Sequence, residues 1–514
     1  MKTHILVDNK QWYSDGSMYA CGYCYDTAGN LYAAESLCGF FANVEDVYSL
    51  EKRLREANGL FSVIIEKDGF CAAGVDRLRS IPLFYTDSGS ISDNPHKLFE
   101  SADIDEEALA FYKSSGSVMP GHTLLNNVHQ VMPGCYVIYE QEQWKTGEYC
   151  NYLCHRGEEQ SVQLYELESA MRRAIMRLTG SIGQRQIVIP LTAGNDSRLI
   201  LCLLREAGYK NVVCYTVTGP DDTEWETAHA TAQHLGYPHY RISPQDPEIQ
   251  RLTEIGGAEF GRYYRHVGCY TNFVWLFEYA AIKVLKASDL INQDAVFVPG
   301  HSGDSFAGSH LVKAHVKPTD TAKTLSRKMM RLGFEYRYSK TVERRLYTYF
   351  KHQLAAGVTP ISAYQNWIMV HRQAHNIVNS VRAYTFFNHE VRLPLWDNEL
   401  YDIFARLPYE SLRNGRLYCS FAEYIFQRNG APSAIEYQPV VWWKRWGKYV
   451  LKPLLRYRPW SSDSIADPLG EWCLAQPLRE ELNGSRNTKN FNRYIGINDL
   501  ISKWYLNRVL EGRG

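Results

Sequence analysis

The chain has 514 residues, of which 45% are hydrophobic and 22% are charged, an ordinary composition for a soluble globular protein. This length exceeds what one hydrophobic core normally supports, so we expect two or more domains. The 56 basic and 56 acidic residues balance, which excludes a general attraction to nucleic acid or to an anionic membrane. We find neither a signal peptide nor an apolar run long enough to span a bilayer, and we expect a cytoplasmic protein.

Residues 1–150 are predicted to form a strand-rich α+β unit. Their strand-like runs are punctuated by Asp-Gly, Gly-Asn and Ser-Gly pairs, which are typical of hairpin turns. These runs lie within 20–35, 59–76, 81–93 and 134–150. Two other segments, 44–57 and 105–114, are predicted to be helical.

The 12 cysteines are scattered along the chain, as expected for the reduced thiols of a cytosolic enzyme. One spacing, Cys21-x2-Cys24 with Cys150-x3-Cys154, supplies the four ligands that a zinc ion needs. Cys21 and Cys24 lie in a strand-like run, however, and no CxxC partner with knuckle-like turns follows them. We therefore interpret these residues as packing cysteines rather than metal ligands.

A different pattern begins near residue 155, where helices alternate with continuous apolar runs. Such runs are typical of strands covered on both faces, and strand–helix alternation at this spacing predicts a parallel, doubly wound sheet. In chain order the predicted elements are a helix over 162–178, a strand over 186–191, a helix over 196–207, a strand over 211–217 and a helix over 222–235. Beyond about residue 320 the chain is predicted to be mostly helical.

The short polar segment TAGNDS, residues 192–197, follows the first buried strand and leads into a predicted helix. In an open parallel sheet, ligands bind beyond the carboxyl ends of the strands. Consecutive amides, the Thr192 and Ser197 hydroxyls and a helix N-terminus can hold phosphate oxygens there. Asp196 would repel a bare phosphate but suits a magnesium ion that bridges to one. The same residues also fit a simple helix cap at Asp196 or Ser197, and local physics leaves both interpretations open. The lysine of a Walker loop is absent.

Three stretches together resemble a known family. The TAGNDS segment resembles the SGGxDS pyrophosphate loop of N-type ATP pyrophosphatases. VPGHSGDSFAG (298–308) and VRAYTFFNHEVRLPLWDNEL (381–400) resemble later segments of the asparagine-synthetase-like amide ligases, with Arg382, Glu390, Arg392, Pro394 and Asp397 in register. NGLFSVII (58–65), VDRLRSIPLFYT (75–86) and ISDNPHKL (91–98) resemble the glutamine-amidotransferase-like domain that these ligases carry.

The resemblance implies two domains. Residues 1–154 would form a degenerate glutamine-amidotransferase-like domain, an α+β sandwich of the Ntn-hydrolase type. Residues 155–514 would form an α/β ATP pyrophosphatase domain with a doubly wound parallel sheet and a helical C-terminal part.

The resemblance also implies a site for ATP and Mg²⁺. Asp196 and Asp304 match the metal-carrying positions. The implied nucleotide-binding residues are Thr192, Ala193, Gly194, Asn195, Asp196, Ser197, Arg198, Thr216, Gly300, Ser302 and Gly303.

Catalytic roles are implied for a lysine, a histidine and a glutamate. Lys444 is our first choice for the lysine that stabilises the developing adenylate, and Lys448 the second. The same stretch also fits a basic amphipathic helix. His301 would accept the proton of an amine nucleophile, with Glu390 orienting it or sharing the role. The alternative for His301 is a structural histidine that donates to a backbone carbonyl.

The sequence departs from the family pattern at several points. The chain starts Met1-Lys2-Thr3, without the N-terminal cysteine of the glutaminase reaction, so we expect no glutamine hydrolysis. Ala193 stands where the loop usually has glycine, and Ser305 stands in place of an acidic residue.

The leading hypothesis is an AMP-forming amide ligase that joins a small-molecule carboxylate to an amine or ammonia, in surface-polysaccharide or natural-product biosynthesis. The basic, Trp-rich stretch 442–460 suits contact with a lipid-linked, membrane-adjacent substrate. A catalytically silent, nucleotide-binding scaffold is the alternative. A sulfur- or tRNA-modifying pyrophosphatase is disfavoured by the neutral charge, and we expect no nucleic-acid partner. The sequence leaves open whether the protein forms a homodimer.

Overall fold

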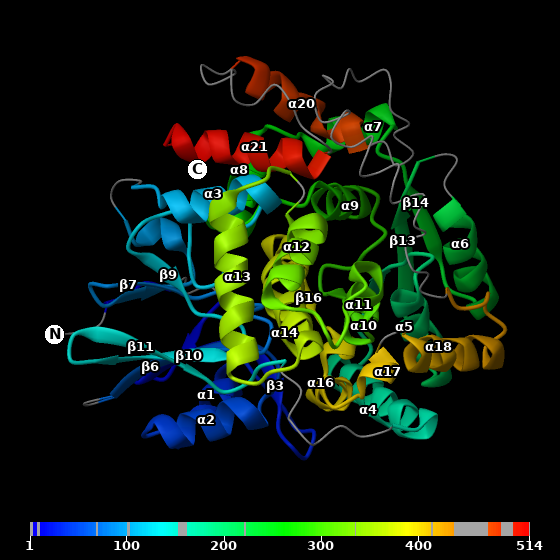
Figure 1. Cartoon of the computed structure of the whole chain (residues 1–514). Coiled ribbons are helices and arrows are strands. Elements are labelled where there is room, and N and C mark those ends of the chain that lie inside the picture. The colour runs from blue at the N-terminus through cyan, green and yellow to red at the C-terminus, as the bar shows by residue number, and fades with distance from the viewer. Residues whose placement is uncertain are drawn as a thin grey trace.

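The computed structural model describes residues 4–7, 11–67, 70–99, 103–152, 162–219, 223–334, 336–412, 415–435, 471–484 and 497–512. Within these ranges the chain forms two sheets in its N-terminal region and a third, parallel sheet further on (Figure 1).

The larger N-terminal sheet has the order β11-β10-β6-β5-β3-β2, and β4 pairs with β3. Its neighbouring strands are antiparallel, with Cys21 opposite Ser62 on β3 and β5. The strands are β2 (Tyr13–Ser14), β3 (Met18–Tyr25), β4 (Leu31–Ala33), β5 (Asn58–Lys67), β6 (Phe70–Val75), β10 (Cys135–Glu140) and β11 (Gln143–Glu148). These strands confirm the hairpins predicted over 20–35, 59–76 and 134–150.

The smaller sheet has the order β1-β8-β7-β9, from β1 (His4–Ile5), β7 (Phe84–Thr86), β8 (Ser90–Ser92) and β9 (Val128–Gln130). One apolar core lies between the two sheets and includes Ile64, Val137 and Ile91. A second core lies between the larger sheet and the helices α1 (Glu35–Phe41) and α2 (Val47–Glu56). The N-terminal region is therefore layered, with helices on the outer face of the larger sheet.

The helices predicted over 44–57 and 105–114 are confirmed as α2 and α3 (Glu106–Ser115). Asp46 and Asp105 cap their N-termini by accepting backbone N–H bonds, as expected of aspartate at this position. Two short elements, α1 and the 3-10 turn η1 (Pro95–Lys97), were not predicted.

The parallel sheet has the order β14-β13-β12-β15-β16, which confirms the predicted parallel sheet. Its strands are β12 (Ile187–Pro190), β13 (Val212–Val217), β14 (His239–Ile242), β15 (Val296–Phe297) and β16 (Glu390–Val391). The chain first adds strands on one side of β12 and then returns to the other side with β15. The order of the strands therefore reverses between β12 and β15, which is where open α/β sheets bind ligands.

Helices make up most of the rest of the second region. The predicted helices correspond to α4 (Leu164–Ile182), α5 (Asn195–Glu206) and α6 (Thr223–Leu235). The others are α7 (Pro247–Thr253), α8 (Ala258–Gly268), α9 (Leu276–Ala287), α10 (Gly303–Phe306), α11 (Ser309–Ala314), α12 (Ala322–Gly333), α13 (Lys340–Ala355), α14 (Pro360–Trp367), η2 (Ile368–Ile377, a π-helix), η3 (Val378–Val381), α15 (Arg382–Phe386), η4 (Pro394–Trp396), α16 (Asn398–Ala405), α17 (Tyr409–Leu412), α18 (Arg416–Arg428), α20 (Glu471–Gly484) and α21 (Ile497–Leu510).

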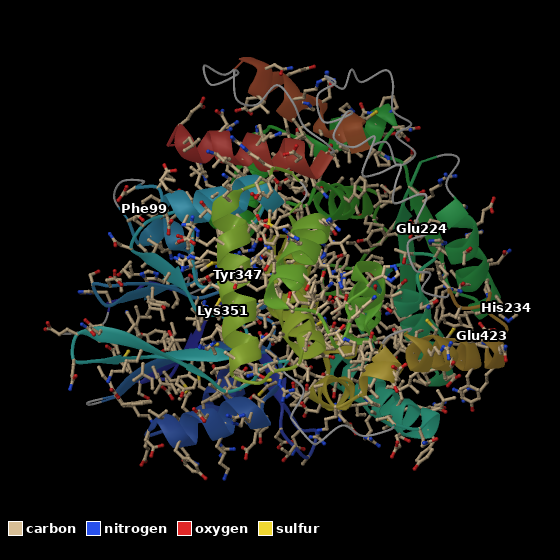
Figure 2. The ribbon with its side chains drawn as sticks, in the orientation of Figure 1. Phe99, Glu224, His234, Tyr347, Lys351 and Glu423 are labelled. Carbon is tan, nitrogen blue, oxygen red and sulfur yellow. The ribbon has the colours of Figure 1, made fainter. Side chains whose placement is uncertain are left out.

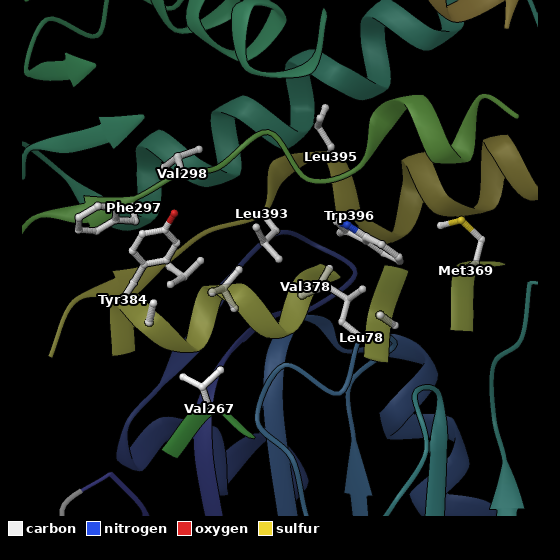
Figure 3. Close-up of a cluster of buried hydrophobic side chains, with 14 of the residues drawn as sticks. Leu78, Val267, Phe297, Val298, Met369, Val378, Tyr384, Leu393, Leu395 and Trp396 are labelled. Carbon is white, nitrogen blue, oxygen red and sulfur yellow. The ribbon is translucent and has the colours of Figure 1, made fainter. Parts of the chain in front are cut away.

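The largest core joins the two regions. It contains Phe84 and Phe111 from the first region and Ile189 from β12. Near its centre Phe297 stacks on Tyr384, with ring centroids 4.3 Å apart (Figure 3). The predicted boundary at 154–155 lies outside the described residues, so the division into two domains stays a prediction.

Contacts that are distant in sequence also tie the regions together. Asp397 accepts hydrogen bonds from Arg177 of α4 (2.7 and 2.8 Å) and from Asn58 of β5 (2.9 Å). The Arg392 guanidinium lies over the ring of Tyr23, 3.8 Å from its centroid. Within the described residues, no helix is both long and apolar enough to cross a membrane.

Candidate functional site

Two loops meet at the carboxyl ends of β12 and β15. The first, residues 191–194, leads into α5, and the second, residues 298–302, leads into α10. They are packed so closely that a Cβ atom on Gly300 would lie 2.7 Å from the backbone nitrogen of Ser197. Only glycine fits at position 300 without moving the first loop. Residues about 100 positions apart in the sequence are thus brought into one site.

The two loops place two carboxylates side by side. The backbone N–H of Asp304 donates to Oδ2 of Asp196 at 3.2 Å. The Asp304 carboxylate accepts hydrogen bonds from the hydroxyls of Ser305 (3.1 Å) and Ser309 (2.9 Å). Burial, reinforced by the negative charge of Asp304, raises the pKa of Asp196 to about 7. The negative charge of Asp304 thus disfavours the ionised form of Asp196, and a bound cation would relieve this repulsion.

Tyr418, on α18, is a member of the site that the sequence did not reveal. Its hydroxyl donates to Oδ1 of Asp196 at 2.6 Å, and the side chain is buried. Gly303 makes room for this contact, because a Cβ atom there would lie 2.2 Å from the Tyr418 hydroxyl. No local motif marks Tyr418, since it is separated from Asp196 by more than 200 residues.

The first loop is held in shape by its own hydrogen bonds. The Ser197 hydroxyl oxygen accepts from the Thr192 backbone N–H at 3.1 Å, and the Thr192 hydroxyl oxygen accepts from the Gly194 N–H at 3.2 Å. Ala193 is only partly buried. The loop leads directly into the twelve-residue helix α5, whose N-terminus carries partial positive charge.

Ser302 lies in the second loop, directly before α10. Its hydroxyl oxygen is buried and has no hydrogen-bond partner. A buried polar atom is normally satisfied, so this hydroxyl is available to a ligand at the point where the loops meet.

Asn195 and Arg198 have structural roles that the sequence did not suggest. The Asn195 side chain donates to the Ile435 carbonyl and accepts from the Ile435 N–H, both at 2.8 Å. Arg198 is fully buried, and its guanidinium donates to the carbonyls of Gly194 (3.2 Å), Pro432 (2.7 Å) and Ser433 (3.1 Å).

The segment 432–435 is therefore fastened to the start of α5. Glu423, on α18 (Figure 2), adds to this by accepting from the backbone N–H of Ala434 at 2.6 Å. The chain leaves this anchor toward Lys444 and Lys448, which lie outside the described residues, as does the stretch 442–460.

Thr216 lies at the end of β13, next to the first loop. Its hydroxyl donates to the Leu191 carbonyl at 2.6 Å and is hydrogen-bonded to Nε2 of His239 at 2.8 Å. The hydroxyl is thus occupied within the protein, and its role toward a nucleotide stays a prediction.

His301 lies in the second loop, as the sequence implies, and its Nε2 is hydrogen-bonded to the Ser380 hydroxyl at 3.1 Å. Burial lowers the pKa of His301 to about 4. The imidazole is therefore neutral near pH 7 and can accept a proton, although it is a weaker base than a solvated histidine. Its predicted alternative partner, a backbone carbonyl, is not the partner of Nε2.

Glu390 does not lie with His301, and the expected partnership between them is corrected by the structure. Glu390 pairs in the sheet with Val296, at the start of β15, and binds Arg185 just before β12 at 2.5 Å. It therefore lies toward the amino ends of the strands, whereas Asp196 lies beyond their carboxyl ends. The motif in which it falls extends across the interface between the two regions, through Arg392 and Asp397.

Cys21 and Cys24 lie on opposite faces of β3, in different cores, because residues three apart on a strand alternate sides. They cannot share one metal ion. Among the described residues, no group of three or more His, Cys, Asp or Glu side chains is placed to hold a metal.

The site thus defines an α/β protein with two acidic residues at the point where the strand order of a parallel sheet reverses. Residues 166–458 match the family described as asparagine synthase. This match spans more than half of the chain, and the chain belongs to the asparagine synthase family. Membership supports an ATP-dependent ligase that forms carbon–nitrogen bonds, and enzymes of this family use ATP, generally with Mg²⁺. No curated protein sequence matches the chain.

Several solved structures show a weaker likeness. A predicted subunit of tRNA methyltransferase from Methanocaldococcus jannaschii is 17% identical, with a TM-score of 0.15, over 35% of this chain and 93% of that one. An allosteric regulatory enzyme of purine biosynthesis is 10% identical, with a TM-score of 0.17, over 63% and 60%. The glutamine phosphoribosylpyrophosphate amidotransferase from B. subtilis is 9% identical, with a TM-score of 0.15, over 56% and 62%. Likenesses at these TM-scores place no constraint on this chain.

Proposed function

We propose that the chain is an AMP-forming amide ligase. A carboxylate oxygen of the acid substrate attacks the α-phosphorus of ATP, the bond to the β-phosphate breaks, and PPi leaves. An amine or ammonia nitrogen then attacks the acyl carbon, loses a proton and displaces AMP, which leaves an amide. The juxtaposition of Asp196 and Asp304 beside two amide-rich loops carries this proposal.

The residues at this point fit a magnesium ion. Mg²⁺ prefers oxygen ligands and is usually held by one or two carboxylates together with substrate phosphates. Asp196 and Asp304 supply the carboxylates, and Ser302, whose hydroxyl has no hydrogen-bond partner, directly precedes the helix that contains Asp304. When bound, the ion would neutralise charge that develops on the leaving PPi.

The phosphates themselves would lie against the first loop and the N-terminus of α5. Backbone N–H groups in the first turn of α5 and the helix dipole attract anions there. The Gly300 contact holds the second loop against Ser197, so both loops would contact the same nucleotide. The Thr216 end of β13 would border the adenine.

The amine rather than glutamine is proposed as the nitrogen source. The thiols of Cys21 and Cys135 in the first region are buried, and burial raises the pKa of each to about 12. A nucleophilic cysteine needs a lowered pKa and some exposure, so neither is suited to attack glutamine. His301 would accept the amine proton.

Lys444 would stabilise the adenylate. It follows Ile435 by nine residues, and an extended chain of that length spans up to about 30 Å. Ile435 is bonded to Asn195 at the start of α5, which supports the proposal that Lys444 acts near the first loop. The biosynthetic context is proposed from the sequence resemblance, and contact with a lipid-linked substrate near a membrane from the basic, Trp-rich stretch 442–460.

ATP–PPi exchange tests the proposal directly, because formation of an adenylate returns labelled PPi to ATP without any amine. We expect exchange that depends on Mg²⁺ and on one member of a carboxylate panel, AMP rather than ADP as product, and no glutamate from glutamine. Asp196→Asn and Asp304→Asn should abolish exchange. Asp320→Asn, at a carboxylate bound to Lys328 far from the loops in sequence, is the matched control.

The silent-scaffold alternative predicts a different result. Nucleotide binding without exchange, for every carboxylate offered, would favour the scaffold and refute the ligase. Formation of ADP in place of AMP would refute the adenylate step specifically.

A further inference from the structure

A cavity of about 280 Å³ lies between the two regions of the chain, and none of its lining residues belongs to the two loops described above. Backbone pairing closes one side of it, since Val118 N–H donates to the Thr271 carbonyl and Phe273 N–H to the Gly116 carbonyl, both at 2.9 Å. Its volume is just under the range of about 300–1,000 Å³ typical of small-molecule sites, which often form between domains.

Aromatic rings form much of the cavity wall. They are Phe273, Trp275, Phe334, Tyr336 and Trp367, contributed by several elements of the second region. Rings of this kind provide a large apolar surface for a flat or cyclic molecule. The cavity therefore favours a ligand with an apolar ring body.

Four polar atoms on wall residues of this cavity are buried and have no hydrogen-bond partner. They are Trp275 Nε1, His371 Nδ1, Arg372 Nε and Asn376 Oδ1. His371 is itself only 4% exposed. Leaving several buried polar atoms unsatisfied is costly, and all four belong to residues that line this cavity. A polar ligand in the cavity would satisfy them once these side chains turn toward it.

The charge of this wall is positive. Arg372 donates through Nη1 to the Leu332 carbonyl at 3.1 Å, and no carboxylate among the described residues forms an ion pair with it. A guanidinium recognises carboxylates through paired N–H groups. Asn376 Oδ1, by contrast, can only accept and requires an O–H or N–H from the ligand.

We propose that this cavity binds a cyclic carboxylate bearing a hydroxyl or amino group, at a site separate from the nucleotide loops. The carboxylate would bind Arg372, the ring would lie among the aromatic side chains, and the hydroxyl or amino group would donate to Asn376. Such a molecule would be an effector of the proposed ligase rather than its substrate, because a carboxylate bound at Arg372 does not lie beside the nucleotide loops.

Calorimetry on the full-length protein without ATP tests the site. The probes are 4-hydroxybenzoate, 4-aminobenzoate and D-glucuronate, and the neutral control is 4-hydroxybenzyl alcohol. At least one carboxylate should bind at up to millimolar concentration, and the alcohol should bind at least tenfold more weakly.

Arg372→Gln should weaken carboxylate binding at least tenfold, and Arg327→Gln, an exposed arginine on α12, should not change it. Asn376→Asp places a negative charge in the wall and provides a second test if Arg372→Gln lowers the yield of folded protein. Failure of all three carboxylates to bind, or equal affinity in wild type and both wall variants, overturns the proposal.

Asp196→Asn separates this proposal from the ligase proposal, because it removes a nucleotide-site carboxylate and should leave probe binding unchanged. Loss of binding in Asp196→Asn would refute the separate site. A change in the exchange rate when the probe is added, without consumption of the probe, supports the effector role, and ATP-dependent consumption of the probe overturns it.

Discussion

Replacing Asp196 by asparagine should make the protein more stable near pH 8 in the absence of Mg²⁺. In the folded chain the pKa of Asp196 is raised to about 7, first by burial and then by Asp304, whereas an unfolded chain has an aspartate pKa near 3.9. The folded chain therefore holds this proton more tightly than the unfolded chain does. The destabilisation is absent at low pH, grows as the pH rises from about 4, and is complete above about 7.

The size of the effect follows from the shift. Three pKa units correspond to about 4 kcal/mol at pH 8, of which roughly 2 kcal/mol is already present at pH 5. Asparagine cannot ionise but can still accept from the Tyr418 hydroxyl and the Asp304 N–H. Asp196→Asn should thus gain most of this free energy, and its advantage over wild type should be about 2–3 kcal/mol larger at pH 8 than at pH 5.

Urea unfolding at the two pH values, in buffers free of divalent cations, measures the difference. Asp320→Asn is the control, because this carboxylate is paired with Lys328 and its loss should destabilise at both pH values. Mg²⁺ with PPi should stabilise wild type more than Asp196→Asn. If Asp196→Asn is no more stable than wild type at pH 8, or if its advantage does not change with pH, the two carboxylates do not repel each other as described.

Three other changes test the site. Tyr418→Phe removes a hydrogen bond to a charged group, worth roughly 1.5–3 kcal/mol. It should raise the pKa of Asp196 further and move the acid limb of the pH profile of PPi release to higher pH, whereas an unmoved profile would argue against this role. Gly300→Ala places a methyl group 2.7 Å from the Ser197 nitrogen and should lower exchange activity at least tenfold while circular dichroism stays unchanged. Arg198→Lys keeps the charge but cannot reach three carbonyls, so it should lower the melting temperature measured by calorimetry.

Regular elements with a strong periodic pattern were predictable from the sequence. The strands β5 and β6 are apolar runs separated by an Asp-Gly pair in the sequence, and β12 and β13 are continuous apolar runs. A hairpin in the first region and a parallel sheet in the second were therefore predictable. Short elements were not predicted from the sequence; α10 and β16, for example, have only four and two residues. Patterns of that length do not distinguish a helix or strand from a loop.

The position of the loops was predictable for a geometric reason. The carboxyl ends of all strands in a parallel sheet lie on the same side of the sheet. Because β12 and β15 are neighbours, the polar segments that follow them lie close together. The same reasoning did not apply to Glu390, because a motif match gives no information about which end of a two-residue strand a side chain occupies. Register in the sheet placed Glu390 beside Arg185, away from the loops.

Contacts made across the fold, rather than along the chain, decide how the site is completed. Tyr418 lies near the start of α18 and donates a hydrogen bond to Asp196. The segment 432–435 follows α18 and is bonded through Ile435 to Asn195, the neighbour of Asp196 in the sequence. Any ligand that moves the start of α5 must therefore also shift α18 or break one of these bonds. The position of the segment 432–435 is thereby linked to the state of the first loop, and neither end of that link carries a local sequence signal.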